Sequence, residues 1–235
     1  MMTTQRQGTL PNAAVEDYLK TIYQHTEWQD EPITPSVLAL KLAVAPASVT
    51  GMVKKLAALG FVDHVPYGPL NLTEEGAARA IAVVRRHRLI ETWLVRDLGY
   101  AWDEVHDEAE LLEHSVSDRL LEAIDERLGH PTHDPHGDPI PDASGTVPVS
   151  AFVLLEDLGP ARQGTVLRVD DRKPELLRLL AVNDIRPGST ITVHERSEDD
   201  LTISAESSGT GPAVRLSIPD AQRIWVQQPS DAVLR

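Results

Sequence analysis

Residues 33–65 read "ITPSVLALKLAVAPASVTGMVKKLAALGFVDHV", and they predict how the N-terminal part of the chain folds. Thr34 or Ser36 can cap a short helix that runs through Leu42, because a side-chain oxygen can accept from the first free amides of a helix. "AVAPAS" predicts a turn, and a second helix follows over residues 47–58, with Gly60 at the usual position after a helix end. The stretch therefore predicts two short helices joined by a tight turn.

The flanking segments extend this pair into a larger unit. Upstream, "VEDYLKTIYQHTEW" places Val15, Leu19 and Ile22 at helical spacing. Downstream, "FVDHVPYGPLNLTEEG" predicts two short strands, residues 61–65 and 70–72, around a Pro/Gly turn. This order of elements is typical of a winged helix-turn-helix, although an ordinary helical hairpin with solvated lysines is the alternative.

The second helix of the pair has an outer side suited to DNA. Its apolar residues Val49, Val53 and Leu56 are expected to turn inward. The outer side and its edges carry Ser48, Thr50, Gly51, Lys54 and Lys55. Small polar residues followed by lysines suit close approach to a DNA groove and its phosphates.

Charge is unevenly distributed along the chain. The net charge of −14 alone argues against nucleic acid and favours cations as partners. Residues 33–88, however, contain seven basic and three acidic residues, whereas acids greatly outnumber bases over residues 100–142. One part of the chain could therefore face a polyanion while the middle binds cations.

Composition predicts a globular protein of one to three domains. The 235 residues are 41% hydrophobic, which is enough for a buried core. The absence of cysteine excludes disulfides and thiolate metal sites and fits a cytoplasmic location. We see no signal peptide and no apolar run near the roughly 20 residues that a membrane span needs.

The remainder of the chain changes from helical to strand-like patterning. A helix is expected from Thr73 to Leu98, and a second from residue 102 or 103 to residue 128. Residues 129–150 are rich in Pro, Gly and Asp and predict a linker. Beyond them, "GTVLRV", "TITVHE", "LTISAE", "AVRLSI" and "IWVQQ" alternate as short strands, with one helical turn at "PELLRLLAVN", which predicts a small β-barrel.

Histidines and carboxylates recur at ligand spacing on the predicted helices. In "DEVHDEAELLEHSVSD", residues 103–118, a helix would stack four such groups on one face, where only a cation relieves their repulsion. "RRHRLIE" adds a histidine and a glutamate one turn apart. The candidate ligands are Asp17, His87, Glu91, His106, Glu110, Glu113 and His114. Imidazole and carboxylate without thiol suit a divalent first-row metal: Mn, Fe, Co, Ni or Zn.

Other interpretations of these residues remain open. A solvated acidic helix with surface ion pairs would show the same letters. The loop "HPTHDPHGD" is expected to be a Pro/Gly turn with exposed histidines rather than a ligand set. A metalloenzyme is a further alternative, but dimetal oxidases use Glu-x-x-His on paired helices, whereas Glu113 and His114 are adjacent here. We therefore expect neither an enzyme nor a small-molecule substrate.

The chain resembles the diphtheria toxin repressor family of metal-dependent transcriptional repressors. The matching segments are "EDYLKTIY", "ASVTGMVKKLAALGFV", "LTEEG", "RRHRLIETWLVRDLGY", "DEVHDEAELLEHSVSD" and "HGDPIP", in the family's order. The resemblance implies a mainly α protein with β: a winged helix-turn-helix domain (residues 1–75), a helical dimerisation and metal-binding domain (76–145) and an SH3-like domain (149–235). It also implies a homodimer that binds palindromic operator DNA when loaded with metal and represses metal-uptake genes.

The resemblance also assigns roles to individual residues. Two metal sites per subunit are implied: a primary site of Asp17, Glu110, Glu113 and His114, and an ancillary site of His87, Glu91 and His106 assisted by Glu175. The implied DNA-contacting residues are Ser36, Ala47, Ser48, Thr50, Gly51, Lys54 and Lys55.

Two departures from the family's iron sensors favour manganese. Those proteins have Met at the position of Asp17 and Cys at that of Glu110, whereas oxygen donors suit Mn²⁺. The two-domain manganese sensors have a further Glu at the position of Lys20. A charged lysine cannot bind a metal ion, so their close pair of metal ions is not expected here. We expect Mn(II), with Fe(II) as the alternative, on a framework of two separated sites.

Overall fold

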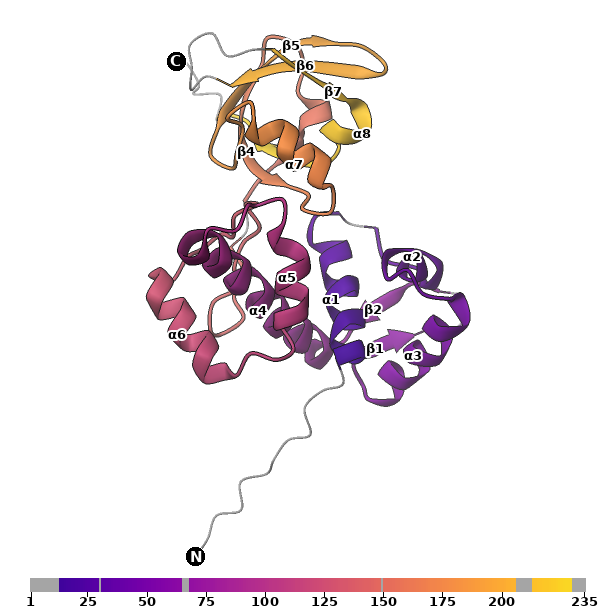
Figure 1. The fold of residues 1–235 in the computed structure, drawn as a ribbon. Coiled ribbons are helices and arrows are strands. Elements are labelled where there is room, and N and C mark those ends of the chain that lie inside the picture. The colour runs from indigo at the N-terminus through magenta and orange to yellow at the C-terminus, as the bar shows by residue number, and fades with distance from the viewer. Residues whose placement is uncertain (1–12, 30, 65–67, 149, 206–212, 230–235) are drawn as a thin grey trace, which may run out of the picture. The chain divides into compact units, whose positions relative to one another are not determined.

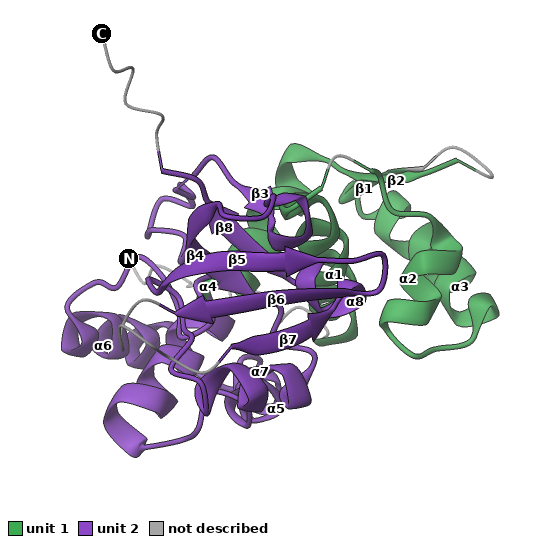
Figure 2. Cartoon of the chain, turned by 90° about the horizontal axis from the view of Figure 1, so that it is seen from above, with its two compact units in different colours: residues 1–85 green, residues 86–235 purple. Residues whose placement is uncertain are grey.

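The computed structural model describes residues 13–29, 31–64, 68–148, 150–205 and 213–229. The chain divides into two compact units, Met1–Arg85 and Arg86–Arg235 (Figure 2). The long helix α4 (Glu74–Leu98) contributes residues to both units.

The first unit is a winged helix-turn-helix, as the sequence predicts. Its elements are α1 (Ala13–Glu27), α2 (Pro35–Lys41), α3 (Pro46–Ala58), β1 (Val62–His64), β2 (Leu70–Leu72) and the start of α4. Thr34 caps α2, since its hydroxyl accepts from the Val37 amide at 3.3 Å. The axes of α2 and α3 are bent by 113°, and β1 pairs antiparallel with β2 (Figure 1). The predicted strand 61–65 is shorter than expected, and Val65 lies outside the described residues.

Apolar residues from every element of the first unit form its core. Leu19, Leu38, Val49, Leu56 and Leu70 are fully or almost fully buried, so α1, α2, α3 and β2 meet around one centre. This packing leaves the other side of α3 exposed. Among the described residues, no single helix is long and apolar enough to cross a membrane, and α2 with α3 meets that criterion only as a bent pair.

The helical part of the second unit contains one break that the sequence analysis did not predict. The single helix expected over residues 102/103–128 is wrong: α5 (Val105–Leu112) ends before α6 (Asp118–Leu128) begins. Ser117 starts α6 by accepting a hydrogen bond from the Leu120 amide at 3.3 Å. Serine favours such a cap over a helix interior, which explains why the helical periodicity on both sides does not continue through it.

The rest of the second unit is a six-stranded antiparallel sheet in the order β3-β8-β4-β5-β6-β7. The strands are β3 (Val153–Leu154), β4 (Gln163–Val169), β5 (Thr190–Arg196), β6 (Asp200–Ala205), β7 (Val214–Ser217) and β8 (Ile224–Gln227). A 3-10 turn (Leu155–Asp157), α7 (Pro174–Ala181) and α8 (Ile218–Ala221) accompany them. The five predicted strands are confirmed, whereas β3 and α8 were not predicted.

Trp102 connects the helical part to the sheet. It precedes α5 in the chain, yet its side chain belongs to the core of the β-rich part, packed with residues such as Leu177 and Val193. The guanidinium of Arg186 lies over its ring, with Cζ 4.9 Å from the ring centroid. The segment that leads into α5 is therefore tied to the sheet.

Candidate metal centre

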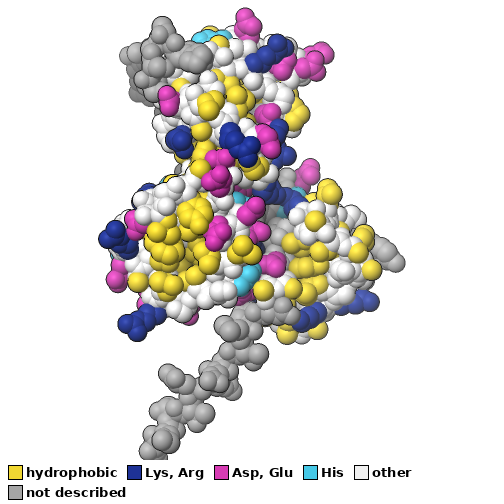
Figure 3. Space-filling view, viewed as in Figure 1, with side chains coloured by type: hydrophobic (Ala, Val, Ile, Leu, Met, Phe, Trp, Pro, Cys, Tyr) yellow, Lys and Arg dark blue, Asp and Glu magenta, His cyan; other side chains and the backbone are white. Residues whose placement is uncertain are grey.

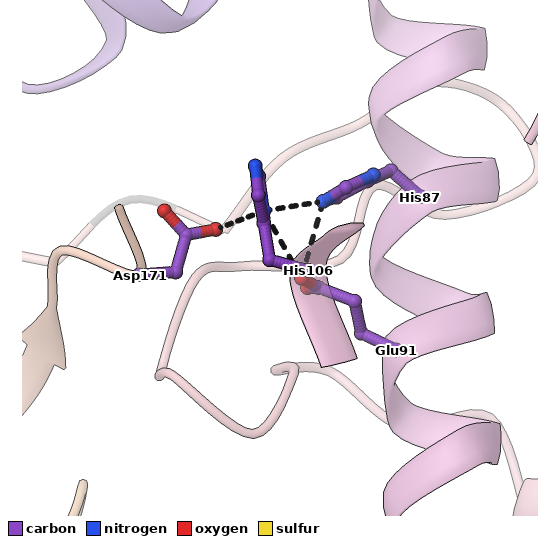
Figure 4. A group of neighbouring side chains, drawn as sticks. All are labelled: His87, Glu91, His106 and Asp171. Carbon is purple, nitrogen blue, oxygen red and sulfur yellow. Dashed lines mark hydrogen bonds and ion pairs between the residues drawn. The ribbon is translucent and has the colours of Figure 1, made fainter. Parts of the chain in front are cut away.

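Four side chains from three elements of the second unit point toward a common centre (Figure 4). His87 and Glu91 lie one turn apart on α4, His106 is on α5, and Asp171 follows β4. His87 Nε2 is 3.1 Å from Glu91 Oε1 and 3.2 Å from His106 Nδ1. His106 Nδ1 is 3.5 Å from Glu91 Oε1 and 2.9 Å from Asp171 Oδ2.

These separations fit a metal ion. Donor atoms that lie about 2.1 Å from an ion are about 3.0 Å apart along an octahedral edge and about 3.4 Å apart along a tetrahedral edge. Glu91 is fully buried, and neither of its side-chain oxygens has a hydrogen bond to the described residues. Burying a carboxylate without such bonds is costly, and a dication removes that cost.

A second group of donors also includes Glu91. Its Oε2 lies 3.7 Å from His136 Nδ1, and Asp134 completes the group. The expectation that the loop "HPTHDPHGD" exposes its histidines is right for His130 and His133 and wrong for His136, which is fully buried.

The environment of His136 explains why it is buried and how it is oriented. Its Nε2 donates to the carbonyl of Trp102 at 2.6 Å, and the two rings stack with centroids 5.9 Å apart. When Nε2 carries the proton of the neutral ring, Nδ1 has a free lone pair that faces Glu91. The sequence of the loop does not predict the contact between His136 and Trp102, because Trp102 belongs to a distant segment.

The loop of residues 134–138 is closely fitted to the sheet. Asp134 Oδ1 accepts from the amides of His136 and Asp138 at 2.8 and 2.9 Å. Arg168 of β4 and Arg88 of α4 both donate to Asp138 Oδ1, at 2.6 and 3.1 Å. A Cβ at Gly137, where φ is +91°, would lie 1.9 Å from the Leu167 carbonyl oxygen, so this position requires glycine.

The predicted primary-site residues of the second unit lie beside the first donor group. Glu113, directly after α5, is buried, and its Oε2 accepts from His87 Nδ1 at 2.6 Å. Its Oε1 is 3.3 Å from Nε2 of the half-buried His114. Glu110 is more exposed, with Oε1 3.6 Å from His106 Nε2. Asp17 lies on α1 in the first unit and is half-buried, and its role as a ligand stays a prediction.

Burial and neighbouring charges set the pKa values of the buried groups. Burial alone would lower the pKa of His106, but Asp171 and Glu91 raise it to about 11. Glu91 and Asp134 likewise overcome burial and raise the pKa of His136 to about 10. His87 and His136 hold the pKa of Glu91 well below its usual value, against the effect of burial. Burial, with Asp138 and Glu91 nearby, raises the pKa of Asp134.

Asp171, rather than the predicted Glu175, faces His106. Glu175 is exposed on α7 and is in none of the donor groups found among the described residues. Asp171 is not among the ligands predicted from the sequence, although its position directly after the strand-like run in "GTVLRVDD" was an available signal. Strand ends commonly carry functional side chains, because the loop that follows is exposed to neighbouring elements.

The predicted DNA-contacting residues are all exposed in the first unit. They are Ser36, Ala47, Ser48, Thr50, Gly51, Lys54 and Lys55. Thr50 Oγ1 donates to the Pro46 carbonyl at 3.1 Å, so part of its hydrogen-bonding capacity is used within α3.

Comparisons with known families cover most of the chain. Residues 12–70 match the iron dependent repressor, N-terminal DNA binding domain. Residues 73–142 match the iron dependent repressor, metal binding and dimerisation domain, and residues 153–228 match the FeoA domain. The chain thus has a DNA-binding domain and a domain for metal binding and dimerisation.

Individual relatives agree with the family models. The iron-dependent repressor IdeR of Mycobacterium bovis is 31% identical over 212 residues, which is 86% of this chain and 82% of the relative. A solved manganese-dependent transcriptional repressor in complex with manganese is 44% identical, with a TM-score of 0.87 over 92% of this chain and 100% of that one. The manganese regulator SloR is 32% identical, with a TM-score of 0.75 over 92% of this chain and 98% of that one. The chain therefore belongs to the family of iron-dependent repressors that includes the diphtheria toxin repressor, and it is a metal-dependent transcriptional repressor with a C-terminal FeoA domain.

Proposed function

We propose that this repressor is activated by Mn(II), binds palindromic operator DNA as a homodimer in the cytoplasm, and represses genes of metal uptake. The observation that carries the choice of metal is the donor chemistry. The donor groups of the described residues consist of carboxylate oxygens and imidazole nitrogens, and the chain has no cysteine. Oxygen-rich sets suit Mn²⁺, whereas sulfur donors favour softer metals. The manganese-dependent repressors among the similar structures support the same choice.

We assign two sites per subunit. The primary site consists of Asp17, Glu110, Glu113 and His114, and the ancillary site of His87, Glu91 and His106, with Asp171 in place of Glu175 as the contribution of the FeoA domain. When bound, a dication supplies the positive charge that allows these carboxylates to lie close together. Because Glu113 orients His87 through a hydrogen bond of 2.6 Å, the two sites are coupled through one imidazole.

Operator binding is assigned to the exposed side of α3. Lys54, Lys55 and Ser48 would contact phosphates, and the set of DNA-contacting residues is completed by Ser36, Ala47, Thr50 and Gly51. Gly51 provides no side chain for base contacts, so specificity would depend more on DNA shape than on direct readout. In a dimer, the two copies of α3 would meet successive major-groove faces about 34–36 Å apart.

Exposed apolar side chains on the second unit support a homodimer. Leu98, Tyr100, Leu111 and Leu120 are exposed by 38–73%, although all four are large and hydrophobic. Figure 3 shows hydrophobic side chains gathered over the helical part of this unit. Contiguous exposed apolar surface is typical of protein interfaces, and this part matches the family's dimerisation domain.

Fe(II) activation is the second candidate. Two mycobacterial relatives named iron-dependent repressor IdeR each match 86% of this chain. Imidazole and carboxylate also bind ferrous iron, so the donor types alone allow both metals.

The deciding experiment is an anaerobic operator titration at buffered free Mn²⁺ or Fe²⁺, with wild type and the double variant Asp17→Met/Glu110→Cys. We expect Mn²⁺ to activate wild type at a lower free concentration than Fe²⁺, and the variant to shift toward Fe²⁺. Equal operator affinity with metal and with chelator would contradict metal activation. Unchanged metal dependence in Asp17→Ala and His114→Ala would contradict the primary site.

A further inference from the structure

We propose that Trp102 is a positioning residue, which anchors the short helix α5 to the core of the β-rich part whether or not metal is bound. His106 and Glu110, which lie on α5, would then be held in place before an ion arrives. The anchoring itself concerns the metal-free chain, and only its consequence for metal activation rests on the proposed function.

Helix α5 has few contacts of its own that would hold it in place. It has eight residues, whereas isolated helices shorter than about 12–15 residues are marginal in water. Its N-cap residue, Glu104, makes no side-chain hydrogen bond to the first amides of the helix. Within α5, only Val105 and Ala109 are buried, and they share a small cluster with Ile90 and Leu94 of α4. The start of α5 therefore depends on contacts made outside the helix.

Trp102 makes such a contact three residues before α5 begins. Among residues 96–104, which join α4 to α5, it is the only one that is buried. Its side chain is 4% exposed and belongs to the same apolar core as Leu158 and Ile185 of the β-rich part. An aromatic side chain of this size buries about 150–250 Å², far more than the alanine and valine of α5 can. The sheet therefore holds the chain at one point, directly before the helix.

Asp103 adds a polar contact at the same junction. Its Oδ2 accepts from Nε of Arg178 on α7 at 2.8 Å, and the side chain of Asp103 is largely buried. An ion pair with a mostly exposed arginine contributes little stability, but it restricts the direction in which the chain leaves Trp102. We therefore assign the holding of α5 to Trp102 and the orientation of its first turn to Asp103.

Neither contact uses a group that would bind an ion. An indole offers a donor N–H and no lone pair for a metal. The carboxylate of Asp103 faces Arg178 and is in none of the donor groups of the described residues. The anchor therefore does not require metal, in contrast to the carboxylate and imidazole contacts around Glu91, whose like charges a cation stabilises.

Hydrogen–deuterium exchange of the full chain in chelator tests the anchor. Relative to the amides of β5 and β6, the amides of α5 should exchange about tenfold faster in Trp102→Ala, because local opening no longer has to break the contact with the sheet. Trp102→Phe, which retains a large ring, should restore most of the protection. Melting in the same buffer shows whether each variant is folded. If Trp102→Ala does not fold, Trp102→Leu replaces it, with a smaller increase expected in the same direction.

Leu201→Ala is the matched control. Leu201 is fully buried in the same core, but it lies on β6, far from α5 in the sequence. Its truncation also leaves a cavity in the sheet, so exchange in the strands should rise without a further rise in α5. If Leu201→Ala exposes α5 relative to the strands as much as Trp102→Ala does, a weaker sheet explains both results and the proposal fails.

Operator titrations with the same variants link the anchor to metal activation. Trp102→Ala should need about tenfold more free Mn(II) for half-maximal operator binding, because a tenfold smaller binding-competent fraction lowers apparent affinity tenfold. Trp102→Phe and Leu201→Ala should stay close to wild type.

Unchanged α5 exchange in folded Trp102→Ala would overturn the anchor. Faster α5 exchange with an unchanged Mn(II) requirement would overturn the role of Trp102 in positioning the ligands. Wild-type operator binding that does not respond to metal would reject the proposed function instead, and the exchange measurement in chelator would still decide the anchor.

Discussion

His106 and His136 show how the surroundings of one residue set its proton affinity. The usual pKa of histidine is 6.5, and neighbouring carboxylates raise those of His106 and His136 to about 11 and about 10. In the metal-free protein at neutral pH, both rings are therefore protonated and balance Glu91 and Asp171. A metal ion must displace these protons, because only the neutral imidazole is a ligand.

Apparent Mn(II) affinity should rise with pH. Between pH 6.5 and 7.5, we expect about a tenfold increase for each proton that a bound ion displaces. Isothermal titration in buffers of different ionisation enthalpy measures both the affinity and the number of protons released. An affinity that is independent of pH in this interval, with no proton release, would contradict metal binding by these histidines.

The same pKa shifts predict the opposite trend for stability without metal. Because folding raises the pKa of His106, its contribution to stability is fully present below pH 6.5 and is lost as pH rises toward 11. The stability difference between wild type and His106→Gln in chelator should therefore shrink between pH 7 and 10. A constant difference over this interval would contradict the raised pKa.

Gly137 offers a test of the close fit between its loop and the sheet. An alanine there would need a positive φ and would place its Cβ 1.9 Å from the Leu167 carbonyl oxygen. We expect Gly137→Ala to lower the free energy of unfolding by about 2–5 kcal/mol, from backbone strain and overpacking together. Gly188→Ala is the control, since Gly188 has the same φ of +91° but open space around its Cβ position. Equal losses in chemical denaturation would show that the close contact contributes nothing.

Helix α3 combines a buried side that holds it in the first unit with an outer side of small residues and lysines. Val49, Val53 and Leu56 are buried, whereas Gly51 has nothing within 4 Å of its Cβ position. Glycine weakens a helix interior, so its presence on the outer side favours a role in close approach rather than in stability.

Gly51→Ala separates these two effects. The variant should raise the free energy of unfolding by about 0.5–1 kcal/mol, because alanine is the better helix former. If α3 lies close to the groove floor, operator affinity should nevertheless fall. Both quantities are measured on the same preparation, by denaturation and by fluorescence anisotropy with operator DNA. Higher stability with unchanged affinity would show that the helix does not approach the DNA closely at this position.

In the whole molecule, metal occupancy and folding of the second unit are linked. The donor groups join α4, α5, the loop after α6 and the end of β4. An ion that binds only the folded arrangement stabilises all of these elements together.

Saturating Mn(II) should therefore stabilise the chain reversibly. At a free concentration 100 times the dissociation constant, we expect a gain of about 2.7 kcal/mol for each bound ion. Calorimetric melting with Mn(II) and then with excess chelator measures the gain and its reversal. Glu91→Gln should lose the part of the gain that the ancillary site contributes, and a full gain in this variant would place that ion elsewhere.

The local elements and the kind of chemistry were predictable from the sequence alone. Helical spacing located α1 to α4, and the run of short alternating segments located β4 to β8. The pairing of His87 with Glu91 was predictable because residues one turn apart on a helix share a face. These inferences succeed because they depend on contacts between residues close together in the chain.

Which distant groups meet Glu91 depends on how the elements pack together. Asp171, Asp134 and His136 come from loops whose paths depend on how the sheet packs against the helices, and no local period encodes that packing. His136 is buried because Trp102 accepts its hydrogen bond while filling the core of the β-rich part. The acidic face is likewise interrupted, because α5 ends at Leu112 and Glu113 and His114 follow it outside the helix. Helical spacing grouped its ligands, but long-range packing determined which partner each of them faces.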